Sequence, residues 1–135
     1  ESGPFQGRAS QWNTAPERLS PGEHAAAISL YLAMMAATCL DMIGAAGPTL
    51  TEGPFARNRV FLDMLATTTG RDVLLPEGSA TGTSVGAALL TQGSTLAEQP
   101  ASHPSPSGEL SIHLTAYANH WRVALAERTE EKETC

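Results

Sequence analysis

Residues 50–90 read LTEGPFARNRVFLDMLATTTGRDVLLPEGSATGTSVGAALL, and the order of elements in this stretch decides the fold. Thr49–Thr51 suits a short strand, and the Glu-Gly-Pro run at 52–54 breaks it. A helical pattern follows from about Phe55 to Thr69, with one apolar face formed by Val60, Phe61, Met64 and Leu65. The stretch therefore begins as a strand, a tight turn and a helix.

The second half of the stretch repeats this alternation. Gly70 is a natural C-terminal cap for the helix, and Asp72–Leu75 favours a second strand that Pro76 ends. Residues 79–90 favour a third helix with early glycines. Alternating helices and strands predict an α/β fold with parallel strands. Because two strands cannot form a parallel sheet covered on both faces, further strands are expected outside this chain.

A long helix is expected before this stretch. Ser20 is a good N-cap, Pro21 suits the first helical position, and Glu23 lies where a capping box requires an acid. The uncharged run Ala25–Leu40 makes the helix apolar most of the way round, so we expect it to be buried between layers. This run is shorter than the ~20 apolar residues that cross a membrane, and no membrane partner is expected.

The flanks are predicted to be less regular. Residues 1–19 read as an irregular segment in which Phe5 and Trp12 serve as anchors. Residues 20–90 form the expected core, and 91–109 carry three prolines and read as a flexible loop. Residues 110–135 form the last unit, with a helix from about Ile112 to Arg128 followed by an acidic tail.

Composition excludes some function classes. The chain has 135 residues, 41% of them hydrophobic, and a net charge of -6, so a nucleic-acid surface is not expected. The polar stretch Glu1–Gly7 does not predict a signal peptide. Cys39 and Cys135 are expected to be free thiols, which fits a cytoplasmic protein.

No catalytic set stands out in the sequence. His113 and His120 could share a face of the last helix, but surface histidines are the favoured interpretation over a metal site. The aspartates at 41, 63 and 72 are interpreted as solvated carboxylates at the ends of helices and strands. No catalytic residue and no metal ligand is therefore assigned.

The turn and its helix follow a spaced pattern. Gly53 opens the turn, Asn58 is a polar residue early in the helix, and Gly70 closes the helix seventeen positions after Gly53. Phe61 and Ala66 lie between them. This pattern resembles the C-terminal part of the FGGY carbohydrate kinase family, which has a strand, a Gly-Gly turn and a helix ending at a glycine with the same spacing.

The resemblance extends through the rest of the stretch, over about 40 residues. Pro76-Glu77, Ala80-Thr81 and residues 85–88 match the next strand and helix of the family, with one extra residue in the loop. Pro54 departs from the family because it replaces the second glycine, so the adenine pocket is expected to differ in shape. Thr67 and Asp63 stand where the family often has Asp and Gln.

The resemblance implies a fold and a site. The fold would be a partial actin-like ATPase domain of the ribonuclease H-like type, with helices packed on a few parallel strands. In the family the Gly-Gly turn contacts the adenosine of ATP, which places Gly53, Pro54 and Asn58 in the nucleotide pocket. ATP and Mg²⁺ are the implied cofactors, and the implied reaction transfers the γ-phosphoryl group to a hydroxyl of a sugar or polyol.

The resemblance also implies what this chain lacks. In the family the sugar site and the catalytic aspartate belong to an N-terminal domain, so the isolated chain is expected to be inactive. Exposed edges of an incomplete sheet would favour self-association, as in a homodimer. Two alternatives remain open at this point: a non-catalytic α/β interaction module, and a piece of an actin-like ATPase that is not a sugar kinase.

Overall fold

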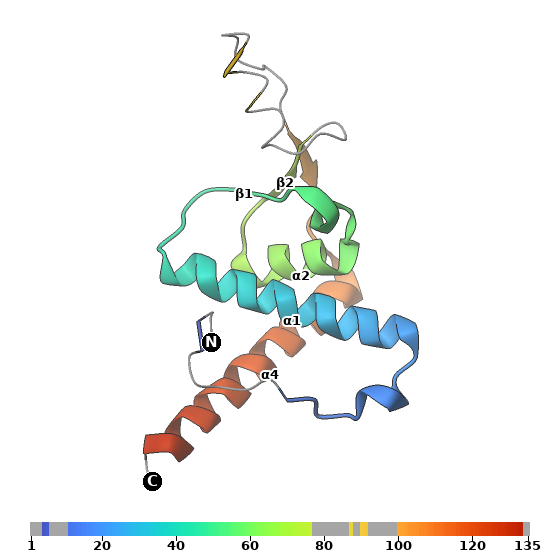
Figure 1. Cartoon of the computed structure of the whole chain (residues 1–135), viewed down its shortest axis with the longest axis vertical. Helices are drawn as coiled ribbons and strands as arrows, with labels where there is room; N and C mark the ends of the chain where they lie inside the picture. The colour runs from blue at the N-terminus through green and yellow to red at the C-terminus, as the bar shows by residue number, and fades with distance from the viewer. Residues whose placement is uncertain (1–3, 6–10, 77–86, 88–89, 92–99, 134–135) are drawn as a thin grey trace.

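The structure is a computed structural model that describes residues 4–5, 11–76, 87, 90–91 and 100–133 (Figure 1). Its elements, in chain order, are η1 Pro16–Arg18, α1 Pro21–Met42, β1 Thr49–Leu50, η2 Gly53–Arg57, α2 Arg59–Thr69, β2 Val73–Leu75, β3 Ala101–His103 and α4 Gly108–Glu133. The described part is therefore a mixed α/β fold, which confirms the predicted class at that level.

Helix α1 begins where its capping residues predict. The Glu23 backbone N–H donates to Ser20 Oγ, and the Ser20 backbone N–H donates to Glu23 Oε2 at 2.9 Å, which completes a capping box. Hydrogen bonds from Ser20 lower the pKa of Glu23 below its usual value. The helix ends at Met42, just before Gly44, whose φ is +62°.

Only one face of α1 is buried. The buried residues are Ser29, Ala33, Met34 and Ala37, whereas Tyr31 and Met42 are exposed. The expectation that α1 is covered on all sides is therefore wrong for its outer face, since no described element packs there. By length and composition alone α1 could also cross a membrane, a test that core helices of soluble proteins pass as well.

The described strands form one small sheet in the order β1-β2-β3. Strands β1 and β2 pair in parallel, with Thr49 opposite Val73, which confirms the predicted parallel pair. Strand β3 pairs antiparallel to β2, with His103 opposite Val73. The structure thus places a strand inside residues 91–109, which the sequence predicted to be a loop.

Helix α2 is the central element. Figure 1 shows it between the strands and α1, and it packs against α1, α4 and β2. Its Leu62, Met64 and Leu65 are almost fully buried and form the middle of the core. It ends at Gly70, whose φ of +64° gives the left-handed cap that the sequence predicted.

Helix α4 covers another side of α2. Its buried residues are Leu114 and Ala118, and burial raises the pKa of the neighbouring Tyr117. It starts at Gly108, earlier than predicted. The predicted third helix, 79–90, lies outside the described residues except for Ala87 and Leu90, which are helical.

The two N-terminal aromatics act as the predicted anchors. The rings of Phe5 and Trp121 on α4 pack edge to face, with their centroids 5.7 Å apart. The ring of Trp12 stacks on His24 near the start of α1. Both contacts attach the irregular segment to helices of the core.

Candidate functional site

The bend between β1 and α2 is where the sequence placed the nucleotide. Thr51 N–H donates to the Leu74 carbonyl at 2.9 Å, so pairing with β2 continues up to the bend. Gly53 then adopts a φ of +68°, and no atom would lie within 4 Å of a Cβ added there. Because this backbone faces open space and carries no side chain, a ligand can approach it closely.

Pro54 follows in the first turn of the short helix η2 and is exposed. Proline is tolerated there because an N–H in the first turn of a helix has no intrahelical partner, and the fixed φ of proline suits the turn. The departure from the Gly-Gly pattern is therefore accommodated locally, without a buried unpaired group.

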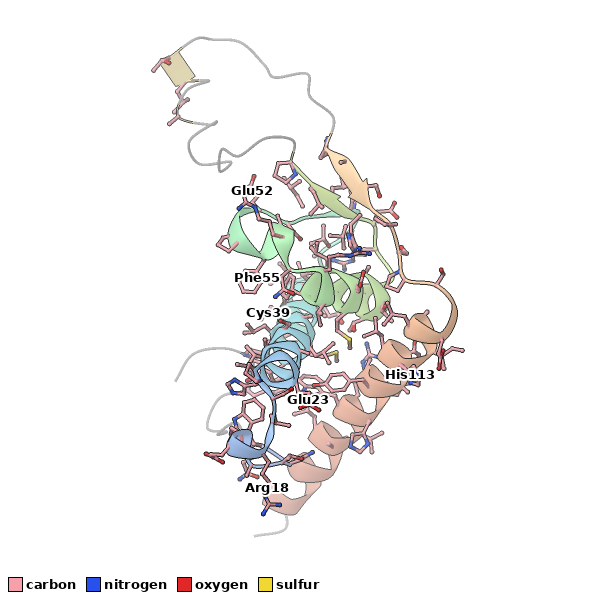
Figure 2. All side chains as sticks on the ribbon, turned by 90° about the vertical axis from the view of Figure 1, so that its right-hand side faces the viewer. Arg18, Glu23, Cys39, Glu52, Phe55 and His113 are labelled. Carbon is pink, nitrogen blue, oxygen red and sulfur yellow. The ribbon has the colours of Figure 1, made fainter. Side chains whose placement is uncertain are left out.

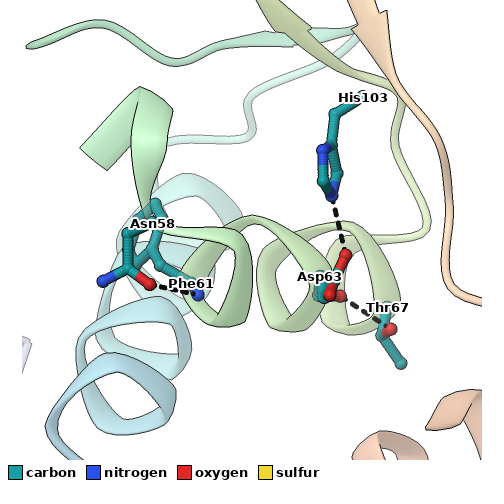
Figure 3. A network of polar contacts seen from close by, with 5 residues as sticks. All are labelled: Asn58, Phe61, Asp63, Thr67 and His103. Carbon is teal, nitrogen blue, oxygen red and sulfur yellow. Dashed lines mark hydrogen bonds and ion pairs between the residues drawn. The ribbon is translucent and has the colours of Figure 1, made fainter. Parts of the chain in front are cut away.

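Asn58 holds the junction between η2 and α2 (Figure 3). Its Oδ1 accepts from the Phe61 backbone N–H at 3.1 Å, which makes Asn58 the N-cap of α2. Its Nδ2 donates to Ser29 Oγ of α1 at 2.9 Å, and Ser29 Oγ donates to the Ala25 carbonyl. The sequence placed Asn58 inside the first turn, but the helix begins one residue after it because residues 53–57 form a separate 3₁₀ helix.

A hollow of about 410 Å³ opens beside the bend. Its volume lies within the range of small-molecule sites. It lies between the C-terminal half of α1 and the segment from β1 to η2. Its lining is mainly aliphatic and aromatic: Ala36, Cys39, Leu40, Ile43, Thr49, Leu50, Thr51, Glu52, Phe55, Phe61 and Leu65. Figure 2 shows Glu52, Phe55 and Cys39 one after another along one side of the molecule.

The hollow offers an aromatic face to a planar ligand. The rings of Phe55 and Phe61 lie 4.7 Å apart, and Phe55 is 40% exposed, so part of its ring is open to a partner. Thr49 Oγ1 is buried and has no hydrogen-bond partner among the described residues.

A second polar contact lies on the strand side of α2. His103 Nε2 and Asp63 Oδ1 are 2.7 Å apart, with side chains only 6% and 14% exposed (Figure 3). Asp63 was interpreted as a solvated carboxylate, which is wrong because β3 places His103 over it. The pair joins β3 to α2 and lies outside the lining of the hollow. Sequence reasoning missed it because forty residues separate the two partners.

The remaining candidate residues do not converge. His113 is exposed and lies 3.4 Å from Glu109 on the same helix, and His120 is also exposed. Cys39 is an exposed free thiol, while Cys135 lies outside the described residues. Within the described ranges, no three His, Cys, Asp or Glu side chains form a group that could hold a metal ion.

The comparisons with known proteins assign the family. No curated protein matches the chain, and no solved structure does. The sequence does match the family described as carbohydrate kinase FGGY, C-terminal domain, over residues 1–100. This match covers the bend, the hollow and both parallel strands, and 100 of the 135 residues in all. The chain belongs to the FGGY carbohydrate kinase family and carries the C-terminal domain of that family.

Proposed function

We propose that this chain is the nucleotide-binding C-terminal part of a cytoplasmic, ATP-dependent kinase that phosphorylates a hydroxyl of a sugar or polyol. The observation that carries the proposal is the open backbone at Gly53, which follows a parallel strand and adjoins the hollow. Membership of a carbohydrate kinase family supports the reaction class. The proposal includes an actin-like, ribonuclease H-like arrangement of the complete protein.

In this proposal the hollow receives the adenine ring. The exposed part of Phe55 offers an aromatic face for stacking, and the aliphatic lining removes the base from water. The backbone at Gly53 and Pro54 lies along the ribose, where the absence of a Cβ on Gly53 allows close approach. Asn58 contributes by holding the bend, since two of its hydrogen bonds go to Phe61 and Ser29.

The reaction needs groups beyond those in this chain. Bound ATP with Mg²⁺ would supply the γ-phosphoryl group and neutralise its charge. Mg²⁺ in kinases is held largely by substrate phosphates and one or two carboxylates, and we assign no residue of this chain to it. An N-terminal domain would bind the sugar and supply the catalytic base. The proposal therefore includes inactivity of the isolated chain.

Cys39 gives a direct test because its exposed thiol lies on the wall of the hollow. In a Cys135→Ser variant Cys39 is the sole thiol, and its rate of reaction with a maleimide can be followed by mass spectrometry. We expect millimolar adenosine to slow this rate several-fold. An unchanged rate would contradict the proposed pocket.

The matched control is a Cys39→Ser variant that keeps Cys135. Its labelling rate should not respond to adenosine, so a slowing in both variants would reveal a non-specific effect. A separate assay would incubate the purified chain with ATP, Mg²⁺ and a panel of sugars. Sugar-dependent ADP formation by the isolated chain would refute its expected inactivity.

A further inference from the structure

Glu52 brings a negative charge to the hollow. Among the described residues that line the hollow, it is the only one with a charged side chain. The other lining residues are aliphatic or aromatic, apart from two threonines and Cys39. Glu52 is exposed and lies between β1 and η2, next to the open backbone at Gly53. The site therefore combines a largely apolar wall with one carboxylate.

The chemistry of a carboxylate limits the groups that it can contact. When ionised it only accepts hydrogen bonds, and its two oxygens offer about four acceptor positions. A ligand group that binds beside Glu52 must therefore be a donor. Phosphate groups are disfavoured at this part of the wall, because like charges placed together repel. In a nucleotide this leaves the sugar hydroxyls and the amino group of the base.

The order of the lining side chains gives the direction of the ligand. In Figure 2 Phe55 lies between Glu52 and Cys39. A base that stacks on the exposed part of Phe55 therefore has Glu52 on one side and Cys39 on the other. Because Gly53 adjoins Glu52 and its backbone allows close approach, the ribose fits the side of Glu52. The amino group of the base then lies away from the carboxylate.

We propose that Glu52 binds the ribose of the nucleotide by accepting hydrogen bonds from its 2′ and 3′ hydroxyls. This inference rests on the proposed function and adds a residue that selects a ribonucleotide over a deoxyribonucleotide. Acidic side chains recognise the ribose 2′ hydroxyl in this way in dinucleotide-binding folds. Such bonds are stronger than those between neutral groups because the acceptor is charged.

The test measures binding of three nucleosides to the 135-residue chain by isothermal titration calorimetry. The unmodified chain should bind 2′-deoxyadenosine about threefold to tenfold more weakly than adenosine, as expected for an exposed charge-assisted bond. It should bind 2′,3′-dideoxyadenosine more weakly still. Glu52→Ala should bind all three nucleosides alike, at the affinity of the dideoxy compound. Glu52→Gln keeps one acceptor oxygen and should lie between the two.

Glu17→Gln is the matched control because Glu17 is an exposed acid on η1 that does not line the hollow. It removes the same charge and should keep the full preference for adenosine. A preference that persists in Glu52→Ala would overturn this inference. So would an equal loss of preference in Glu17→Gln, since that result indicates only the effect of net charge.

The outcomes separate this inference from the function on which it rests. If adenosine and 2′,3′-dideoxyadenosine bind the unmodified chain equally, Glu52 has no role toward the ribose and the pocket stands. If purine riboside, which lacks the amino group, loses the affinity instead, Glu52 recognises the base and its assignment to the ribose is overturned. If no nucleoside binds at millimolar concentration, the pocket and this inference both fall.

Discussion

Asn58 Nδ2 donates a hydrogen bond of 2.9 Å to Ser29 Oγ, which fixes the start of α2 against the middle of α1. The two residues are 29 positions apart, and both are partly or fully buried. Because η2 ends at the same asparagine, the contact also sets the position of the bend relative to α1. The amide of Asn58 therefore links the junction of η2 and α2 to α1, the helix whose C-terminal half lines the hollow.

Replacement of Asn58 by Ala should lower the free energy of unfolding by about 2 kcal/mol, since it removes both an N-cap and a buried hydrogen bond. Asn58→Ser keeps a capping oxygen and should lose about half as much. Urea unfolding followed by circular dichroism gives both values. Equal stability of Asn58→Ala and the unmodified chain would show that neither bond contributes.

Gly53→Ala should destabilise the fold by about 1 kcal/mol, because an alanine is strained at a φ of +68°. Free space around the new Cβ means that no clash adds to this strain. Gly22→Ala is the matched control, since Gly22 lies in the first turn of α1 with equal space around it. That change should stabilise the chain by roughly 0.5 kcal/mol. The two melting temperatures should therefore move in opposite directions.

His103→Ala should destabilise the chain by about 2–3 kcal/mol, because it leaves the Asp63 carboxylate largely buried without its 2.7 Å partner. A double-mutant cycle with Asp63→Ala should give a coupling free energy of about 1 kcal/mol or more. His113→Ala serves as the control, since its contact with Glu109 is exposed and should contribute nothing measurable. Additive effects in the cycle would rule out a direct interaction.

The capping box predicts a pH dependence. Hydrogen bonds from Ser20 lower the pKa of Glu23 in the folded state, so its ionised form stabilises the fold above its unfolded-state pKa. This contribution is lost as the pH falls through the folded-state pKa.

Glu23→Gln, which cannot ionise, is the variant that checks this dependence. The unmodified chain should exceed the variant in stability at about pH 7, and the difference should shrink once the pH falls below about 4.3, the ordinary pKa of glutamate. A difference that grows toward acid pH would contradict the assignment.

The sequence predicted the elements that depend on neighbouring residues. Ser20 and Glu23 are three residues apart and form their cap within one turn, and Gly70 ends α2 through its own backbone conformation. The bend at Gly53 belongs to the same group. These features could be read directly because the residues that cause them adjoin one another in the chain.

Features that join distant segments could not be predicted. Strand β3 lies between Pro100 and Pro104, in a stretch that reads as a loop, and it forms because β2 provides a strand to pair with. The residues next to Asp63 in the sequence do not indicate that His103, forty residues away, will cover it. The hollow likewise combines Cys39 of α1 with Phe55 of η2, and its existence follows from how α1 packs on α2. Periodicity alone also gave no reason for the outer face of α1 to remain exposed.

The match to the kinase family stops at residue 100, but the core does not. His103 of β3 lies over Asp63, while Leu114 and Ala118 of α4 close the side of α2 away from the sheet. The family match and the hydrophobic core therefore end at different residues. A truncation at residue 100 would remove Leu114 and Ala118 from the core. Chimaeras between relatives should therefore keep α4 together with α2.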